Sequence, residues 1–237
     1  MHMDRRQFVK NLGLGTASLS MGSLVTASSC APSGDSSLKQ NVKEGEDGQF
    51  LFIGDDIAIA QTEYGKVQGY LLNHVYTFLG VPYGADTSGK NRFMPPQKPE
   101  PWTDVRPAVF YGNTAPQRME NRWPNNYGTF ADHWNYWDVS EDCLYLNVWT
   151  PGIADGKKRP VLVWLHGGGF TNGSGIEQDG YHGENISREG DIVFCSINHR
   201  LGPIGFSDLS GVGGEAYKDS GNVGMLDIIA ALRWVHD

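Results

Sequence analysis

Three consecutive glycines after an apolar run are the residues of this chain whose spacing points most directly to chemistry. Residues 161–165 are all apolar, and Gly167, Gly168 and Gly169 follow His166. A continuous apolar run predicts a central strand that is buried on both faces. Glycine has no Cβ, so its backbone N–H group can point into a cavity close to a ligand. Such groups can stabilise a developing oxyanion, and the loss of one donor typically costs about 3 kcal/mol.

The segments around this run predict further strands and a helix that would hold the glycines in place. Strands are expected within 50–60 and at 65–69, 144–149 and 191–197. The prolines at 95–101 exclude regular structure there. A helix is expected at 221–236, and this order of elements favours an α/β sheet. Its apolar face would consist of residues spaced i, i+3, i+4 and i+7, namely Met225, Ile228, Ile229 and Leu232.

Eight short blocks of sequence occur in a characteristic order between residue 78 and residue 237. They are 78–83 (FLGVPY), 92–96 (RFMPP), Trp102, 140–148 (SEDCLYLNV), 166–170 (HGGGF), 198–206 (NHRLGPIGF), 221–227 (GNVGMLD) and 234–237 (WVHD). Together they resemble the type-B carboxylesterase family, which includes cholinesterases, bacterial p-nitrobenzyl esterases and the non-catalytic neuroligins. The resemblance covers nearly everything from about residue 62 onward. It implies an α/β-hydrolase fold that is incomplete, with the N-terminal strands, the oxyanion loop and the first helices of the central sheet.

The resemblance also assigns roles within the glycine loop. Gly168 and Gly169 would be the oxyanion donors, while Gly167 would serve the turn. His166 would shape the loop and not act as a base, and Phe170 would contact the substrate. The implied reaction is hydrolysis of a small-molecule carboxylic ester, with neither a cofactor nor a metal ion.

The nucleophile of this family lies in a G-x-S-x-G elbow, and no serine of the chain fits that pattern. Ser174 lacks the glycine two residues before it, and Ser207 lacks the glycine two residues after it. The family order would place the serine beyond Asp237, with the acid and the histidine later still. We therefore expect the 237 residues alone to lack esterase activity and, with an unfinished sheet, to be poorly stable.

Other positions acquire structural roles from the same resemblance. Arg92 and Glu141 would form an ion pair that ties the proline-rich loop to the strand at 144. Many family members bridge the cysteine at the position of Cys143 to an earlier one, but Ala115 stands at that earlier place. Cys143 would then be a buried free thiol, and a bridge to Cys195 is the alternative.

An aromatic-rich loop precedes Glu141 and contains Trp134 followed by an asparagine. In cholinesterases the equivalent loop carries a tryptophan that receives the choline cation, and a tryptophan face attracts quaternary ammonium. Trp134 would accordingly bind the substrate. The alternative is that these aromatic side chains simply pack and line the wall of a gorge.

The N-terminal residues read as an export signal and a linker. Residues 1–30 combine the twin arginine Arg5-Arg6 with a weakly hydrophobic stretch and small residues, which resembles a bacterial twin-arginine signal. Cys30 follows small residues as in a lipoprotein cleavage site, so lipid attachment there is one expectation, and cleavage with release into the periplasm is the other. Residues 31–49 are polar and predict a flexible linker, followed by the esterase-like part at 50–237.

Charge and composition exclude some partners but select no substrate. The formal net charge of −8 argues against nucleic acid or an anionic membrane surface as a partner. Two alternatives to a hydrolase stay open: a binding protein on the same fold, as in neuroligins, and a truncated gene product without function. The glycine loop favours the enzyme, and a G-x-S-x-G sequence following Asp237 would discriminate between them.

Overall fold

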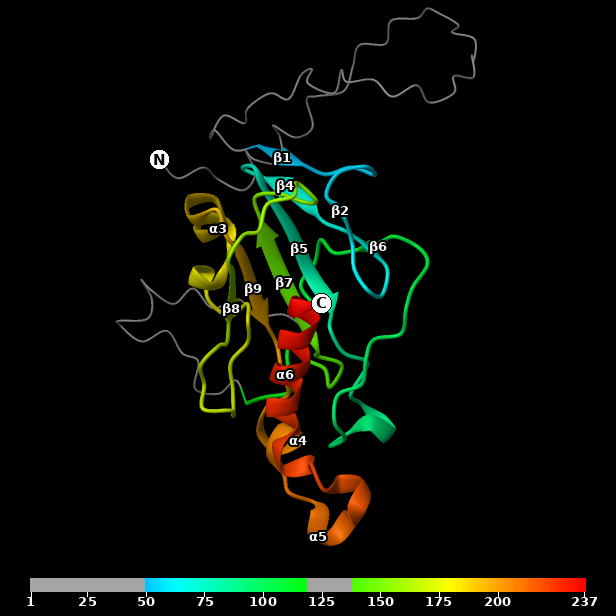
Figure 1. The fold of residues 1–237 in the computed structure, drawn as a ribbon. Coiled ribbons are helices and arrows are strands. Elements are labelled where there is room, and N and C mark those ends of the chain that lie inside the picture. Colours follow the sequence, from blue (N-terminus) through cyan, green and yellow to red (C-terminus); the bar gives the residue numbers. More distant parts are fainter. Residues whose placement is uncertain (1–49, 119–137) are drawn as a thin grey trace, which may run out of the picture. The chain divides into compact units, whose positions relative to one another are not determined.

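A six-stranded mixed sheet organises the computed structural model, which describes residues 50–118 and 138–237 (Figure 1). Neighbouring strands are antiparallel except for the last pair, β9 and β8, which are parallel. In spatial order the strands are β1 (Leu51–Phe52), β4 (Tyr70–Leu72), β5 (Val75–Pro82), β7 (Tyr145–Thr150), β9 (Val193–Ile197) and β8 (Val161–Trp164). The strands predicted at 144–149 and 191–197 are confirmed as β7 and β9, within two residues at their ends.

A second, smaller sheet holds three short strands, β2 (Ile59–Gln61), β3 (Lys66–Gln68) and β6 (Arg106–Pro107). The first pair is antiparallel and the second is parallel. The indole Nε1 of Trp102 donates to the carbonyl of Lys66 at 2.8 Å, which attaches the proline-rich segment to β3. The proline-rich residues 95–101 contain no helix or strand, as predicted.

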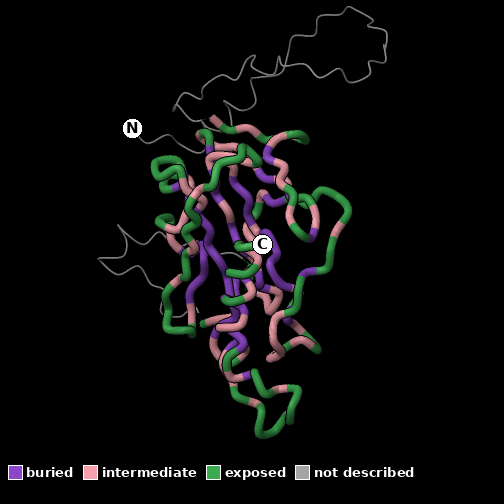
Figure 2. Tube along the Cα trace, viewed as in Figure 1, coloured by how far each residue is buried: buried purple, intermediate pink, exposed green. Residues whose placement is uncertain are grey.

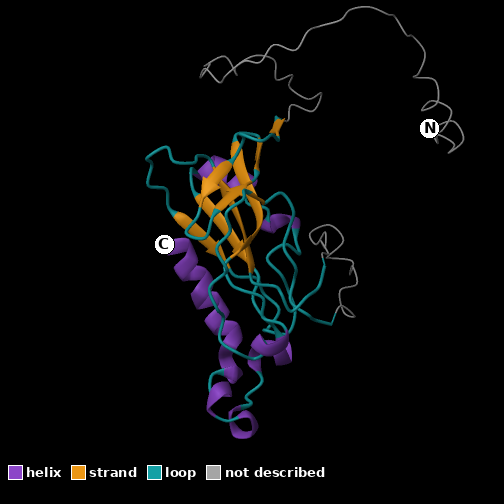
Figure 3. Cartoon of the chain, turned by 90° about the vertical axis from the view of Figure 1, so that its right-hand side faces the viewer, coloured by secondary structure: helices purple, strands orange, loops and turns teal. Residues whose placement is uncertain are grey.

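The longest described helix, α6 (Val223–His236), lies along one side of the main sheet (Figures 1 and 3). The remaining helices are short. They are α3 (Glu184–Gly190), α4 (Gly202–Phe206) and α5 (Ser210–Gly213), with 3₁₀ turns at Gly89–Asn91, Asp179–Tyr181, Glu215–Tyr217 and Ser220–Asn222. No helix among the described residues is long and apolar enough to cross a bilayer.

The core lies where β5, β7 and β9 run side by side, and Figure 2 shows these strands as the most continuously buried part. Leu146 and Ile197 are fully buried and face one another across the β7–β9 ladder. Trp149 and Phe194 form a second cluster with Val75 and Leu79. Apolar side chains on both faces of β9 are covered, as expected for an interior strand.

The prediction that residues 161–165 form a buried central strand is half wrong. β8 is a strand, but Val161 is 49% exposed and Leu162 is 37% exposed, and these neighbours point to opposite faces. Within the described residues, β8 is the last strand of the sheet and pairs only with β9. Its apolar side chains are therefore exposed because no further strand or helix of the described part covers them.

The helix predicted at 221–236 is confirmed as α6, but the predicted apolar face is rotated. Ile229 and Leu232 are exposed. The buried face instead holds Val223, Gly224, Asp227, Ile228 and Ala231. Small residues face inward because α6 packs closely on α4, where a Cβ at Gly224 would come within 2.5 Å of the Phe206 ring.

Candidate oxyanion loop

The glycine loop leaves the C-terminal end of β8 and turns back on itself within a few residues. The Gly168 carbonyl accepts the N–H groups of Thr171 and Asn172, at 3.1 and 3.3 Å, and the Thr171 hydroxyl at 2.9 Å. Gly168 has φ +119° and Gly169 has φ +60°, which favours glycine. A Cβ on Gly168 would lie 1.9 Å from the Asn172 carbonyl oxygen, so the turn closes only with glycine there.

The backbone N–H groups of Gly168 and Gly169 have no hydrogen-bond acceptor in the part of the chain that the structure describes. Both residues are exposed, and neither N–H donates to an acceptor within 50–118 or 138–237. The carbonyls of the peptide groups that carry these N–H groups are hydrogen-bonded: the Gly167 oxygen lies 2.9 Å from His166 Nδ1, and the Gly168 oxygen accepts the bonds of the turn. Hydrogen bonding at the carbonyl polarises a peptide group and strengthens its N–H as a donor.

Two side-chain amides hold the return leg of this loop. Gly173 donates to Gln117 Oε1 at 2.7 Å and accepts from Gln117 Nε2 at 2.9 Å. Gly175 donates to Asn198 Oδ1 at 2.8 Å. The sequence analysis predicted neither side-chain amide contact. It considered the segment of Gln117 only because Ala115, two residues earlier, stands at a position where many family members have a cysteine. Two features of the sequence could have pointed to these amides: Gln117 at the end of the segment 114–117, and Asn198 at the start of the block 198–206.

His166 contacts the loop and a second histidine. Its ring stacks on that of His199, with centroids 4.8 Å apart and planes inclined by 10°. Because a carbonyl only accepts, His166 Nδ1 must carry the hydrogen that binds Gly167. The His199 Nδ1 similarly binds the Arg200 carbonyl at 2.9 Å, and burial lowers the pKa of His199. These contacts suit a histidine that shapes the loop.

Phe170 and Trp134 were the two predicted substrate contacts. Phe170 lies beside the glycines, is exposed, and its ring is 5.0 Å from that of Phe206. Its carbonyl accepts the N–H of Gly202 at 2.7 Å, which joins the loop to the start of α4. Trp134 lies outside the described residues. Substrate contact by either side chain stays a prediction.

A hollow of about 560 Å³ lies against the loop. Its lining consists of residues 116–118 together with Thr171, Asn172, Gly202 and Pro203. It therefore adjoins the return leg of the glycine turn at Thr171 and Asn172, while Gly168 and Gly169 are not among its lining residues.

The charges and thiols given structural roles by the sequence lie apart from the loop. Arg92 Nε is 2.7 and 2.9 Å from the two carboxylate oxygens of Glu141, so these residues form the expected ion pair. Cys143 and Cys195 are both buried and free. Cys143 packs in the same core cluster as Ala115. Among the described residues, no group of three or more His, Cys, Asp or Glu side chains could hold a metal ion.

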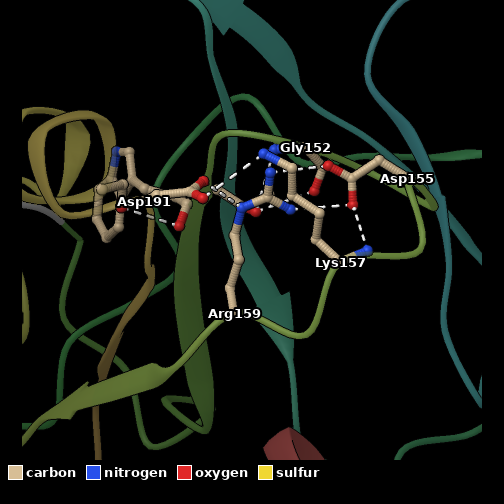
Figure 4. A network of polar contacts seen from close by, with 8 residues as sticks. Gly152, Asp155, Lys157, Arg159 and Asp191 are labelled. Carbon is tan, nitrogen blue, oxygen red and sulfur yellow. Dashed lines mark hydrogen bonds and ion pairs between the residues drawn. The ribbon is translucent and has the colours of Figure 1, made fainter.

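A network of charges that the sequence did not reveal joins the starts of β8 and β9 (Figure 4). Arg159 Nη2 lies 2.7 Å from Asp155, and Arg159 Nε lies 2.7 Å from Asp191. Lys157 Nζ lies 3.6 Å from Asp191. Arg159 lowers the pKa of Asp155 to about 2 and also lowers that of Asp191. The network lies at the opposite end of β8 from the glycine loop, so it braces the strand and not the site.

The sequence matches a model of the carboxylesterase family over residues 56–237. The chain belongs to the carboxylesterase family. It is 41% identical over 182 residues to para-nitrobenzyl esterase of Bacillus subtilis (strain 168), which covers 76% of this chain and 34% of the relative. It is 44% identical over 179 residues to phenmedipham hydrolase of Pseudarthrobacter oxydans, and this match covers 76% of this chain and 34% of that relative.

A solved carboxylesterase relative supports the fold. An esterase from anaerobic Clostridium hathewayi, described as able to hydrolyse aliphatic aromatic polyesters, matches with a TM-score of 0.71 and 41% identity. The match covers 78% of this chain and 36% of that esterase. This carboxylesterase chain thus spans about a third of the length of its relatives, and the predicted, incomplete α/β-hydrolase fold is confirmed.

Proposed function

We propose that residues 50–237 supply the oxyanion-stabilising part of a serine carboxylic-ester hydrolase. One observation carries the proposal: Gly168 and Gly169 present exposed N–H groups without a protein acceptor among the described residues, on a turn closed by its own hydrogen bonds. Membership of the carboxylesterase family supports the general reaction, because the matched relatives are ester hydrolases.

The geometry indicates how the loop would act on an ester. A serine hydroxyl attacks the ester carbonyl, and the carbonyl oxygen becomes negative as the tetrahedral intermediate forms. The N–H groups of Gly168 and Gly169 would donate to that oxygen during acylation and again when water releases the acid. Because the turn is already formed, little reorganisation is needed as charge develops. No serine of the 237 residues lies in a G-x-S-x-G elbow, so the attacking serine is not identified in this sequence.

A chimera tests this proposal. Residues 56–237 would replace the matching third of the Bacillus subtilis para-nitrobenzyl esterase. We expect the chimera to hydrolyse p-nitrophenyl acetate and the 237-residue chain alone to give no turnover above a heat-killed control. A folded but inactive chimera, or turnover by the chain alone, would contradict the proposal.

Two glycine variants of the chimera separate the donors from the rest of the loop. Gly168→Ala places a Cβ 1.9 Å from the Asn172 carbonyl and displaces the turn. We expect it to lower kcat by about 100-fold or more, as for the loss of one oxyanion donor. Gly167→Ala is the matched control, because a Cβ there has no neighbour within 4 Å. Equal losses in both variants would show that the loop does not act through defined donors.

The binding-protein alternative makes a different prediction. A non-catalytic protein on this fold would lack the nucleophile elbow altogether. Reading the coding sequence downstream of the Asp237 codon distinguishes a hydrolase from a binding protein and from a truncated product. An open frame that reaches G-x-S-x-G supports the hydrolase, whereas an open frame without it supports a binding protein, and an immediate stop supports a truncated product.

We further propose that the protein is exported to the bacterial periplasm or cell envelope. The support is the twin arginine at Arg5-Arg6 and the small residues before Cys30, all of which lie outside the described residues. Replacing both arginines by lysine should retain the protein in the cytoplasm in a cell-fractionation experiment. Cys30→Ser should release an anchored protein into the soluble periplasmic fraction, and unchanged fractionation would leave simple cleavage as the mode of export.

A further inference from the structure

We propose that Gln117 is a positioning residue for the oxyanion donors and acts through the backbone of Gly173. This inference rests on the proposed function, since it takes Gly168 and Gly169 as the donors. The Gln117 carboxamide is fully engaged. Its Oε1 accepts the Gly173 N–H at 2.7 Å, and its Nε2 donates to the carbonyls of Gly173 and Ala115 at 2.9 and 3.1 Å.

The backbone that carries Gln117 is fixed in the core. Ala115 is 2% exposed and packs in the main cluster. Thr114 donates from its N–H to the Asp138 carbonyl at 2.9 Å and accepts the Ser140 N–H at 3.0 Å. The Asn113 carbonyl accepts from Asn198 Nδ2 at 3.1 Å. Gln117 therefore extends from a buried, hydrogen-bonded stretch of backbone to a loop 56 residues further along the chain.

Gly173 is in close contact with the peptide groups that carry the donors. It has φ +112°, and a Cβ there would lie 2.2 Å from the Gly167 carbonyl oxygen. Its neighbour Asn172 donates from its N–H to the Gly168 carbonyl. A displacement of Gly173 would consequently move the peptide groups before Gly168 and before Gly169, whose N–H groups are the candidate donors.

The contacts with Gly173 and Ala115 require a side-chain amide with the length of glutamine at position 117. Gln117→Met keeps the length but removes both hydrogen-bond functions. Gln117→Glu keeps an acceptor for the Gly173 N–H but sets a carboxylate oxygen against the carbonyls of Gly173 and Ala115. Because Asn198 still holds Gly175 at 2.8 Å, either change should loosen the loop without releasing it.

Isotope labelling can observe these few glycines in the intact 237-residue chain. Asn-Gly occurs once in the sequence, so ¹³C-carbonyl asparagine with ¹⁵N-glycine isolates the Gly173 amide by NMR. Gly-Gly occurs three times, so doubly labelled glycine isolates Gly168, Gly169 and Gly214. Gly214 lies in a different segment and serves as an internal control. Gln97→Met is the matched variant, because Gln97 is exposed and, among the described residues, its side chain binds only the Pro95 carbonyl, two residues away.

We expect Gln117→Met to shift the amide signals of Gly173, Gly168 and Gly169 and to speed Gly173 hydrogen exchange about tenfold or more. Gln117→Glu should shift the same signals by less. Gly214 should keep its signal, and Gln97→Met should change none of the four. The proposal is overturned if a Gln117 variant shifts the amide signal of Gly173 but not those of Gly168 and Gly169. It is also overturned if all four glycine signals, including that of Gly214, change and the free energy of unfolding falls with them.

These measurements do not depend on ester turnover. If Gln117 positions the loop, its variants will show the shifts even when the chimera is inactive. If the chimera is active but the Gln117 variants show no shifts, the positioning role of Gln117 is refuted while the proposed function stands. Should Gln117→Met fail to fold, Gln117→Glu decides the question by the signals of Gly168 and Gly169.

Discussion

The ion pairs Arg200–Asp227 and Arg92–Glu141 differ in their exposure to water. The side chains of Arg200 and Asp227 are 1% and 0% exposed, and their closest atoms are 2.6 Å apart. Asp227 Oδ2 also accepts the Arg200 backbone N–H at 3.1 Å, and Arg200 Nη1 donates to the Met94 carbonyl at 2.8 Å. Removing one partner of such a buried pair leaves an uncompensated charge in a medium of low dielectric constant.

We expect Asp227→Asn to lower the free energy of unfolding by about 3–5 kcal/mol, because Arg200 stays buried and charged. Glu141→Gln is the matched control. Its partner Arg92 is about half exposed, so the loss should be several times smaller, because water screens an exposed ion pair. Urea denaturation of the three proteins at pH 7 measures both values. Comparable losses in the two variants would show that burial does not set the importance of the Arg200–Asp227 pair.

At the scale of elements, the sequence predicted the type of each main strand and helix better than its burial. The apolar run at 161–165 identifies a strand, but coverage depends on neighbours that the run does not encode. In α6, the spacing of large apolar residues correctly placed Ile228 inward but wrongly placed Ile229 and Leu232 there. The helix instead turns Gly224 and Ala231 inward, since small residues permit close approach to α4, and Asp227 inward to meet Arg200.

The candidate site shows the same division. The glycine loop could be singled out because the run 166–170 (HGGGF) occurs in order with seven other blocks typical of the family, and its role as oxyanion donor stays a prediction. The amides that hold the loop could not be singled out, because Gln117 and Asn198 bind backbone atoms 56 and 23 residues away. A side-chain amide bonded to a backbone group has no counterpart residue whose type could reveal the pair.

The exposed strand β8 should promote self-association of the 237-residue chain. Val161 and Leu162 are exposed on opposite faces at the end of the described sheet. Exposed apolar strands at a sheet edge are sites of association. Val161→Thr combined with Leu162→Thr should reduce the associated fraction in sedimentation velocity, while the free energy of unfolding changes by less than about 1 kcal/mol.

Phe194→Thr in the adjacent strand β9 is the matched control, because Phe194 is buried and pairs with Leu162. It should destabilise the protein and increase association. If the double threonine variant associated as strongly as the unmodified chain, the contact would lie elsewhere on the molecule.

At the scale of the whole molecule, two buried thiols make stability depend on pH. Burial raises the pKa of Cys195 to about 12 and raises that of Cys143 further still. The unfolded thiols titrate near pH 8.5. Above that pH the unfolded state binds fewer protons than the folded state, so the free energy of unfolding falls as pH rises and is largest below about 8.5.

The size of this fall follows from the separation of the pKa values. Between pH 7 and 10, each thiol should lower the free energy of unfolding by about 2 kcal/mol, since one pKa unit corresponds to about 1.4 kcal/mol. Urea denaturation across this range should show the loss. A double variant, Cys143→Ala with Cys195→Ala, should have a shallower pH profile even though it begins less stable at pH 7.

The slope separates titration of the thiols from their packing. Packing losses in the double variant are independent of pH, whereas proton release by an exposed thiol grows with pH, so only the slope reports on titration. Tyrosines contribute in the same direction but only near and above pH 10, because burial raises the pKa of Tyr111 to about 12 from an ordinary value near 10. Both thiols are buried in the core, so they should resist ionisation in the folded state. If the free energy of unfolding fell equally steeply from pH 8.5 to 10 in the unmodified chain and in the double variant, the thiols would ionise as readily folded as unfolded, and the prediction would be wrong.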